Sequence, residues 1–255
     1  KNVVKSYKVM RGGADVTGNY TFTDSVDGKL TILPRTVTLT SETASKEYNG
    51  TPLTRPDVSV TGDGFVSGEV TGITATGSVT YVSDGTVENT ITYTTGAAFR
   101  EENYEITKIP GKLSITQSSN AIVITTASGS REYNGKKLLD SQTTHTGTLA
   151  EGDRLVVEFP ADAGLTDVGT KRNEYKSYRV ERSDGADVTA NYTFGEPVIG
   201  TLTVTPVAIE LTANSAAKAY DGTPLTDSGY TISNGSFVGE EGLAGVTVEG
   251  SQTAV

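Results

Sequence analysis

The sequence predicts an all-β protein made of tandem β-sandwich-like, immunoglobulin-like repeat domains of about 85 residues in an elongated array. Three observations predict this fold class. Short runs of the chain alternate apolar and polar residues with the two-residue period of strands. Glycine-containing turn motifs recur at one spacing along the sequence. No segment has the 3.6-residue apolar period of an amphipathic helix.

The clearest predicted strands open and close each repeat. In the segment 36–40, Val37 and Leu39 fall on one face of the strand and the threonines on the other. An opening strand with the same pattern is expected at Ile209 and Leu211. The predicted closing strands contain the pairs Leu30 and Ile32, Leu113 and Ile115, and Leu202 and Val204.

Between these strands the sequence predicts several more. Their ranges are 78–82, 89–95, 103–109, 154–159, 176–182 and 191–194. Residues near 149–154 and 240–245 are compatible with single helical turns. Six or more short strands in each repeat, with regular turn signals, favour a two-layer sandwich, and a β-grasp-like open sheet is the alternative.

Three sequence motifs share one period. A basic-X-Tyr-(Asn/Asp)-Gly motif contains Tyr48, Tyr133 and Tyr220, which are spaced by 85 and 87 residues. An Asn-Tyr motif contains Tyr20, Tyr104 and Tyr192, and a Gly-X-Leu motif begins at Gly28, Gly111 and Gly200. The Asn-Gly and Asp-Gly steps predict tight turns, because glycine accepts a positive φ. We expect each motif tyrosine to pack on a core and to tether its turn through its hydroxyl.

A longer period divides the repeats into two types, called A and B here. The segment 13–22 matches 185–194, and 50–54 matches 222–226. The predicted domains are 1–34, the C-terminal part of a B-type repeat; 35–117, an A-type repeat; 118–206, a B-type repeat; and 207–255, the N-terminal part of an A-type repeat. The two end segments are too short to fold alone. They are expected to belong to a longer array, or to be completed by strand exchange with a partner chain.

The composition narrows the functional classes. The chain has no Cys, which excludes disulfides, thiol chemistry and cysteine zinc sites. Its formal net charge of −10 disfavours nucleic-acid binding, because phosphate backbones repel acidic surfaces. No apolar run approaches the ~20 residues of a membrane helix, so no membrane insertion is expected in this fragment. Neither end reads as a signal peptide or a wall-sorting signal.

The predicted connections between repeats are short. Little more than Pro34 or Pro206 separates a closing strand from the next opening strand, and residues 117–120 form the third connection. Proline fixes φ and stiffens such a connection. We therefore expect a semi-rigid rod in which the partners of each repeat are the neighbouring repeats of the same chain.

Together the motifs resemble the YDG/MBG-type tandem repeat domains of large bacterial surface, adhesin-like proteins. The resemblance rests on segments 46–53 (Lys-Glu-Tyr-Asn-Gly-Thr-Pro-Leu), 191–194 (Asn-Tyr-Thr-Phe) and 200–206 (Gly-Thr-Leu-Thr-Val-Thr-Pro). It implies an extracellular location at the bacterial cell surface or cell wall, and stalk or adhesive repeats, without implying a ligand. The B-type repeat departs from the pattern at Arg131 and at Lys136 and Lys137.

No residue is predicted to be catalytic, cofactor-binding or metal-binding. His145 is the only histidine, and no Ser or Asp is spaced informatively around it for a nucleophilic triad. The adjacent pairs Glu101–Glu102 and Glu240–Glu241 lack the cleft that glycosidic carboxylates need. The Asp184–Asp187 turn and its counterpart at Asp15 are expected to initiate turns. Calcium binding there is the alternative, and titration calorimetry tests it.

Two functions therefore remain, and neither is enzymatic. The first is a structural stalk that projects an adhesive tip from the cell. The second is direct binding of host glycan, mucin or an extracellular matrix protein by the repeats, for which the twelve tyrosines and the loops between 61 and 78 supply surface.

Overall fold

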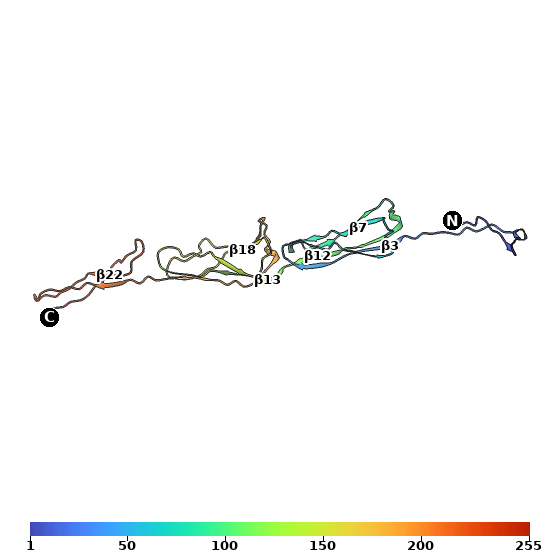
Figure 1. Ribbon diagram of the computed structural model, residues 1–255. Helices are drawn as coiled ribbons and strands as arrows, with labels where there is room; N and C mark the ends of the chain where they lie inside the picture. Colours follow the sequence, from blue (N-terminus) through green and yellow to red (C-terminus); the bar gives the residue numbers. More distant parts are fainter. The chain divides into compact units, whose positions relative to one another are not determined.

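The computed structural model describes all residues from Lys1 to Val255 and is built from β-strands (Figure 1). It contains no α-helix, so the predicted all-β class is confirmed. Near 149–154 and 240–245 the structure has one hydrogen-bonded turn each, from Ala150 to Asp153 and from Val238 to Glu241, and neither continues into a helix. The only helical segments are the 3₁₀ helices η1 (Thr17–Asn19), η2 (Val82–Asp84), η3 (Glu101–Asn103) and η4 (Thr189–Asn191).

Packing divides the chain into two compact units, which are described separately. The first unit contains residues 1–44, 53–79 and 86–114, and the second contains residues 45–52, 80–85 and 115–255. The domain boundaries expected from the sequence are not tested by this division and stay a prediction.

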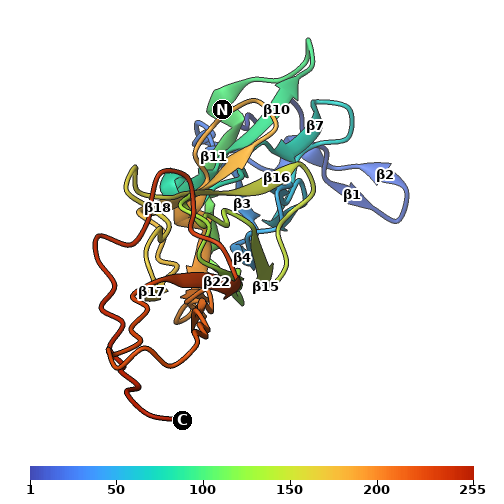
Figure 2. The same cartoon turned by 90° about the vertical axis from the view of Figure 1, so that its left-hand side faces the viewer.

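Ten strands lie within the first unit, and two more, β4 and β12, continue from it into the second. The ten are β1 (Met10–Arg11), β2 (Ala14–Asp15), β3 (Arg35–Ser41), β5 (Leu53–Thr54), β6 (Val58–Gly62), β7 (Val70–Ala75), β8 (Ser78–Val79), β9 (Thr86–Asn89), β10 (Ile91–Thr95) and β11 (Tyr104–Ile109); β4 spans Ala44–Glu47 and β12 spans Gly111–Thr116. Strand β3 is central to one sheet, parallel to β11 and antiparallel to β6. Strand β10 pairs with β7, and β1 with β2 as a small hairpin (Figure 2).

The core of the first unit lies between two of these sheets. Val37 and Leu39 of β3 are fully buried, as their alternation predicts, together with Tyr104 of β11. Ile91 of β10 and Ile73 of β7 pack against them from the other sheet. Two sheets facing one core favour a two-layer sandwich over the β-grasp-like open sheet.

The second unit contains ten further complete strands. They are β13 (Ser118–Thr126), β14 (Gly129–Glu132), β15 (Thr143–Thr146), β16 (Asp153–Glu158), β17 (Gly169–Arg172), β18 (Ser177–Arg182), β19 (Tyr192–Phe194) and β20 (Thr201–Thr205), followed by the pair β21 (Glu210–Ala213) and β22 (Tyr230–Asn234). Strand β13 is parallel to β19 and antiparallel to β15, which is the order of β11, β3 and β6 in the first unit. Strand β20 lies between β14, to which it is parallel, and β17.

In two of the three Gly-X-Leu motifs, those of Gly111 and Gly200, a close backbone approach requires the glycine. A Cβ on Gly111 would lie 2.1 Å from the Glu42 carbonyl oxygen, and one on Gly200 would lie 2.2 Å from that of Ala127. The Gly111 amide donates to Ser41 Oγ at 2.9 Å, and the Gly200 amide donates to Thr126 Oγ1 at the same distance. A larger residue at either glycine would separate the closing strand from the hydroxyl that its amide bonds.

The terminal segments expose residues whose motif counterparts are buried. The closing strand expected at Leu30 and Ile32 is not formed, and these side chains are 70% and 95% exposed. The counterparts of Leu30 are Leu113 and Leu202, which are fully buried, and those of Ile32 are Ile115 and Val204, which are at most 5% exposed. That strand prediction is wrong because an apolar strand needs a paired neighbour and a facing sheet, and residues 1–34 supply neither.

Candidate functional site

Each basic-X-Tyr-(Asn/Asp)-Gly motif forms a tight turn. Gly50, Gly135 and Gly222 have φ values of 80°, 72° and 76°, as the sequence predicts. Asn49 Oδ1 accepts a hydrogen bond from the Thr51 amide at 3.1 Å, which closes the turn in the manner of an Asx turn.

The basic residue of the motif braces this turn. Lys46 Nζ donates to the Thr51 carbonyl oxygen at 2.7 Å and to Asn49 Oδ1 at 2.9 Å. In the second turn Arg131 donates to the Lys136 carbonyl oxygen. Either cation can donate across the turn, which explains why the motif accepts both lysine and arginine.

The tyrosine of the first turn bonds a buried carboxylate within the second unit. Tyr48 Oη donates to Asp153 Oδ2 at 2.8 Å, and Tyr192 Oη donates to the same oxygen at 2.7 Å. The two rings meet edge to face with centroids 5.4 Å apart. One carboxylate oxygen therefore joins the turn tyrosine to the Asn-Tyr tyrosine, which η4 places at the start of β19.

Arg182 completes this cluster, which we call the tyrosine–carboxylate joint (Tyr48, Asp153, Arg182 and Tyr192). The register of β16 and β18 sets Asp153 directly opposite Arg182. The guanidinium donates to Tyr48 Oη and to the Gly50 carbonyl oxygen, both at 2.9 Å. The Asp153 carboxylate is wholly buried, and its Oδ1 has no hydrogen-bond donor. Arg182 Nη1, at 3.8 Å from that oxygen, supplies the compensating charge.

The joint changes the acidity of its tyrosines. Burial and the hydrogen bond to Asp153 raise the pKa of Tyr48 well above its usual value. Burial is also the largest cause that raises the pKa of Tyr192, and the Asp153 carboxylate adds to it. Both hydroxyls are therefore neutral donors throughout the physiological pH range.

The second turn makes a corresponding contact. Tyr133 Oη donates to Glu241 Oε1, and this bond is the largest cause that raises the pKa of Tyr133. A Cβ on Gly135 would lie 2.9 Å from the Val238 side chain. In the first turn a Cβ on Gly50 would lie 3.1 Å from Ala150 Cβ. We call the turns of Tyr48 and Tyr133 docked, because each tyrosine bonds an acid from another segment of the chain. In both of them the glycine has a second role, since it lets the turn approach the surface that carries the acid.

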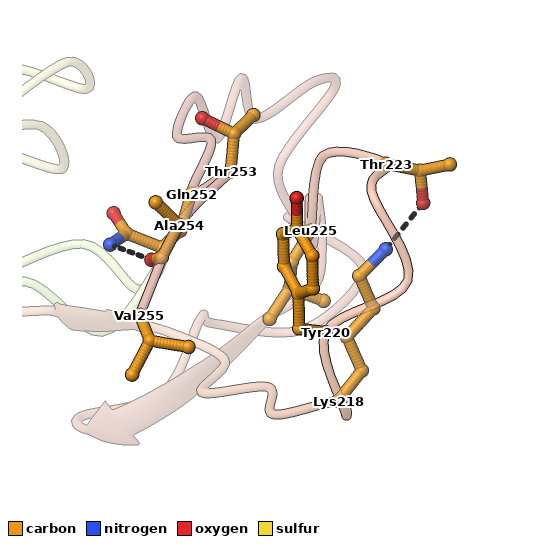
Figure 3. Close-up of a pocket in the computed structure, with 8 residues that line it drawn as sticks. All are labelled: Lys218, Tyr220, Thr223, Leu225, Gln252, Thr253, Ala254 and Val255. Carbon is orange, nitrogen blue, oxygen red and sulfur yellow. Dashed lines mark hydrogen bonds between the residues drawn. The ribbon is translucent and has the colours of Figure 1, made fainter.

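The third turn has no such acceptor. Lys218 Nζ braces it by donating to Thr223 Oγ1 at 2.6 Å (Figure 3). Tyr220 is 72% exposed, and nothing lies within 4 Å of a Cβ built on Gly222. A cavity of about 310 Å³ opens beside this turn, between Tyr220 and the last four residues of the chain.

The motif tyrosines follow their predicted role only in part. Tyr48, Tyr104 and Tyr192 are buried, whereas Tyr20 and Tyr220 are exposed. The expectation that the hydroxyl tethers its own turn is wrong for Tyr48. Its partner Asp153 is 105 residues downstream, because the lysine already satisfies the turn.

The other predicted candidates remain apart from the joint. His145 is exposed on β15, opposite Ile124. Asp187 Oδ1 accepts from the Thr189 amide at 2.9 Å and initiates a turn, as expected. Glu102 is exposed in η3, and Glu241 is exposed in a loop, where it accepts a hydrogen bond from Tyr133. No group of three or more His, Asp or Glu residues could hold a metal ion. The structure also has no helix with the length and apolarity to cross a bilayer.

The joint residues Asp153 and Arg182 were not found from the sequence. The sequence does contain one signal for the acid of the joint. Glu69 and Glu241 stand at the place that corresponds to Asp153 in the two A-type segments, and they are 172 positions apart, which is the longer period of the repeats. The B-type counterpart is an aspartate, so a search for one repeated residue type misses it.

None of the family models, curated proteins or solved structures with which the chain was compared matches it.

Proposed function

We propose that the chain is a series of structural repeats from the extracellular stalk of a bacterial cell-surface, adhesin-like protein. The observation that carries the proposal is the tyrosine–carboxylate joint. Tyr48 belongs to the A-type repeat expected at 35–117, and Asp153 and Tyr192 belong to the B-type repeat expected at 118–206. A spacer must keep consecutive domains in a fixed orientation, and a buried hydrogen-bonded joint restricts their rotation.

The connection between the same two repeats is pinned as well. Glu47 accepts from the Ser119 amide at 3.1 Å and from Ser119 Oγ at 2.9 Å, and these bonds lower the pKa of Glu47. Gln117 Nε2 donates to the Ala190 carbonyl oxygen at 3.0 Å. Both ends of the short connection are thus bonded to the repeats on either side, which supports a stiff spacer rather than a flexible linker.

The contact recurs with a different acid. Tyr133 and Glu241 repeat it between the segments expected as a B-type repeat and the start of the next A-type repeat. A recurring joint is more useful to an array than to an isolated domain. We propose no catalytic, cofactor-binding or metal-binding residue.

Small-angle scattering of the whole chain tests the stalk. We expect an extended particle whose distance distribution broadens in the Asp153→Ala variant, since that variant loses the acceptor of both tyrosines. A compact envelope would contradict the rod. Labelling of intact cells with an antibody against the chain tests the extracellular location, and absence of labelling unless the cells are lysed would contradict it.

A glycan array and a mucin pull-down with the whole chain separate the stalk from direct binding. The stalk proposal expects no retained ligand. Clear, saturable binding would replace it with the adhesive function.

A further inference from the structure

A cavity of about 340 Å³ in the first unit has the residues of an acceptor but holds no turn. Its lining includes Arg35, Val66, Glu69, Glu102, Asn103 and Tyr104. These residues come from the start of β3, the loop before β7, and η3 with the start of β11. The corresponding parts of residues 118–206 hold the turn of Tyr48.

The hydrogen bonds around this cavity match those of the docked acceptor. Tyr104 Oη donates to Glu69 Oε2 at 2.6 Å and accepts from the Val66 amide at 3.0 Å. Tyr192 Oη likewise donates to Asp153 Oδ2 and accepts from the Ala150 amide at 2.9 Å. The tyrosine, the carboxylate and the backbone amide of an acceptor are therefore all in place at Tyr104, and the turn tyrosine is missing.

The missing group is identified by its two occupied counterparts. Asp153 bonds Tyr48 in addition to Tyr192, and a carboxylate has room for several donors. Val66 is 45% exposed at the mouth of the cavity. Val238, which occupies the same place in its repeat, lies against Gly135 of a docked turn.

Charge selects the B-type turn as the occupant. The cavity is lined by two carboxylates, those of Glu69 and Glu102, and by one cation, Arg35, so its lining carries a net negative charge. Beside its tyrosine the B-type turn carries Arg131, Lys136 and Lys137, and Lys136 lines one cavity with Glu240 and Glu241 in the second unit. The A-type turn has neutral Thr51 and Pro52 at the corresponding place, and its acceptor supplies Arg182 instead.

We propose that this cavity is a binding site for a basic Tyr-Asn-Gly turn from a repeat of the 118–206 type. The tyrosine hydroxyl of that turn donates to the Glu69 carboxylate, and its glycine packs on Val66. The two lysines of the turn lie next to the acidic side chains at the mouth of the cavity. The inference rests on the proposed repeat function and adds to it a rule of order, since each acceptor takes the turn of the other repeat type.

Two-dimensional NMR of the isotope-labelled whole chain, titrated with a backbone-cyclised peptide of the sequence 129–138, tests the site. Cyclisation removes most of the ordering cost of a free turn. We expect shifts confined to amides at Val66, Glu69 and Asn103, with a dissociation constant on the order of 1 mM. The peptide with Tyr133→Ala should lose the shifts, and a cyclised peptide of the sequence 45–53 should bind several-fold more weakly.

Two chain variants complete the test. Glu69→Gln should weaken binding about tenfold, equivalent to about 1.4 kcal/mol. Val66→Lys, at an exposed position, should block the cavity and leave the amide signals of β3 and β10 unchanged. Absence of shifts at about 10 mM peptide, or equal shifts with the Tyr133→Ala peptide, would overturn the inference. A coupling free energy between Tyr48→Phe and Asp153→Asn, measured in the same chain, shows separately whether the joint itself stands.

Discussion

The turn at Tyr48 and the turn at Tyr220 have nearly the same sequence and backbone but opposite surroundings. Both carry a lysine brace and a glycine with a φ near 80°. Tyr48 is 5% exposed and Tyr220 is 72% exposed. The motif therefore determines the turn by itself, whereas burial of the tyrosine depends on an acid from a segment about one repeat downstream.

Asp153→Ala should have the largest effect on the difference between the buried turn at Tyr48 and the exposed turn at Tyr220. It leaves two buried tyrosine hydroxyls and Arg182 without their carboxylate, so we expect the free energy of unfolding of this region to fall by about 3–5 kcal/mol. Hydrogen exchange at amides of β16 and β18 in increasing denaturant measures it. Asp221→Ala, in the turn of Tyr220, is the control and should cost much less, because that aspartate is exposed to solvent. Equal losses in the two variants would contradict a special role for the joint.

Alkaline pH should open the joint next. The pKa values of Tyr48 and Tyr192 are raised above the ordinary value of 10.0, so the unfolded chain releases these protons first. Their stabilisation is complete below pH 10.0 and is lost as the pH rises above it. Each tyrosine contributes a slope of about 1.4 kcal/mol per pH unit there.

Stability curves between neutral and strongly alkaline pH measure this slope. The double variant with phenylalanine at positions 48 and 192 should lose the part of the slope that these two tyrosines contribute, whereas Tyr133, whose pKa is also raised, keeps its own part. An unchanged slope in that variant would show that other groups cause the alkaline transition.

Glycine substitution separates turn geometry from docking. Gly50→Ala and Gly222→Ala both place a Cβ at a positive φ, which costs about 1 kcal/mol. Only Gly50→Ala also brings that Cβ to 3.1 Å from Ala150 and 3.3 Å from Arg182. We expect it to cost about 1–2 kcal/mol more, from displacement of the turn. Chemical denaturation of both variants provides the comparison, and a matching pair of values would mean that the turn does not rely on docking.

The smallest expected effect comes from single hydroxyls. Tyr48→Phe removes one donor to a buried carboxylate and should cost about 1–2 kcal/mol. Tyr220→Phe removes an exposed hydroxyl and should change the free energy of unfolding by less than about 0.5 kcal/mol. Thermal unfolding of the two variants side by side measures the difference, and a larger loss for Tyr220→Phe would refute the assignment of docked and free turns.

Local patterns allowed much of the fold to be predicted from the sequence. The alternation at Val37 and Leu39 correctly gave the buried face of β3, and the Asn-Gly step gave the turn at Gly50. The closing strand at Leu30 and Ile32 was wrong because a strand forms only where another strand pairs with it. Local patterning contains no information on that partner.

The joint could not be predicted in the same way. Asp153 and Arg182 meet through the register of β16 and β18, and register depends on the whole sheet. Tyr48 was expected to bond within its turn because the brace from Lys46 was not foreseen. Once the lysine satisfies the turn, the hydroxyl is free to reach a distant acid.

The parallel pairing of β14 with β20 has a mechanical consequence. When tension is applied at the ends of residues 118–206, it pulls the last strand, β20, along its own axis. Strand β20 then has to slide past its parallel neighbour β14, with which it pairs from Gly129 opposite Leu202 to Glu132 opposite Thr205. The hydrogen bonds of such a pair lie across the direction of pull, so they must yield together in shear rather than one at a time by peeling. A segment with this strand order is suited to carrying load along its length.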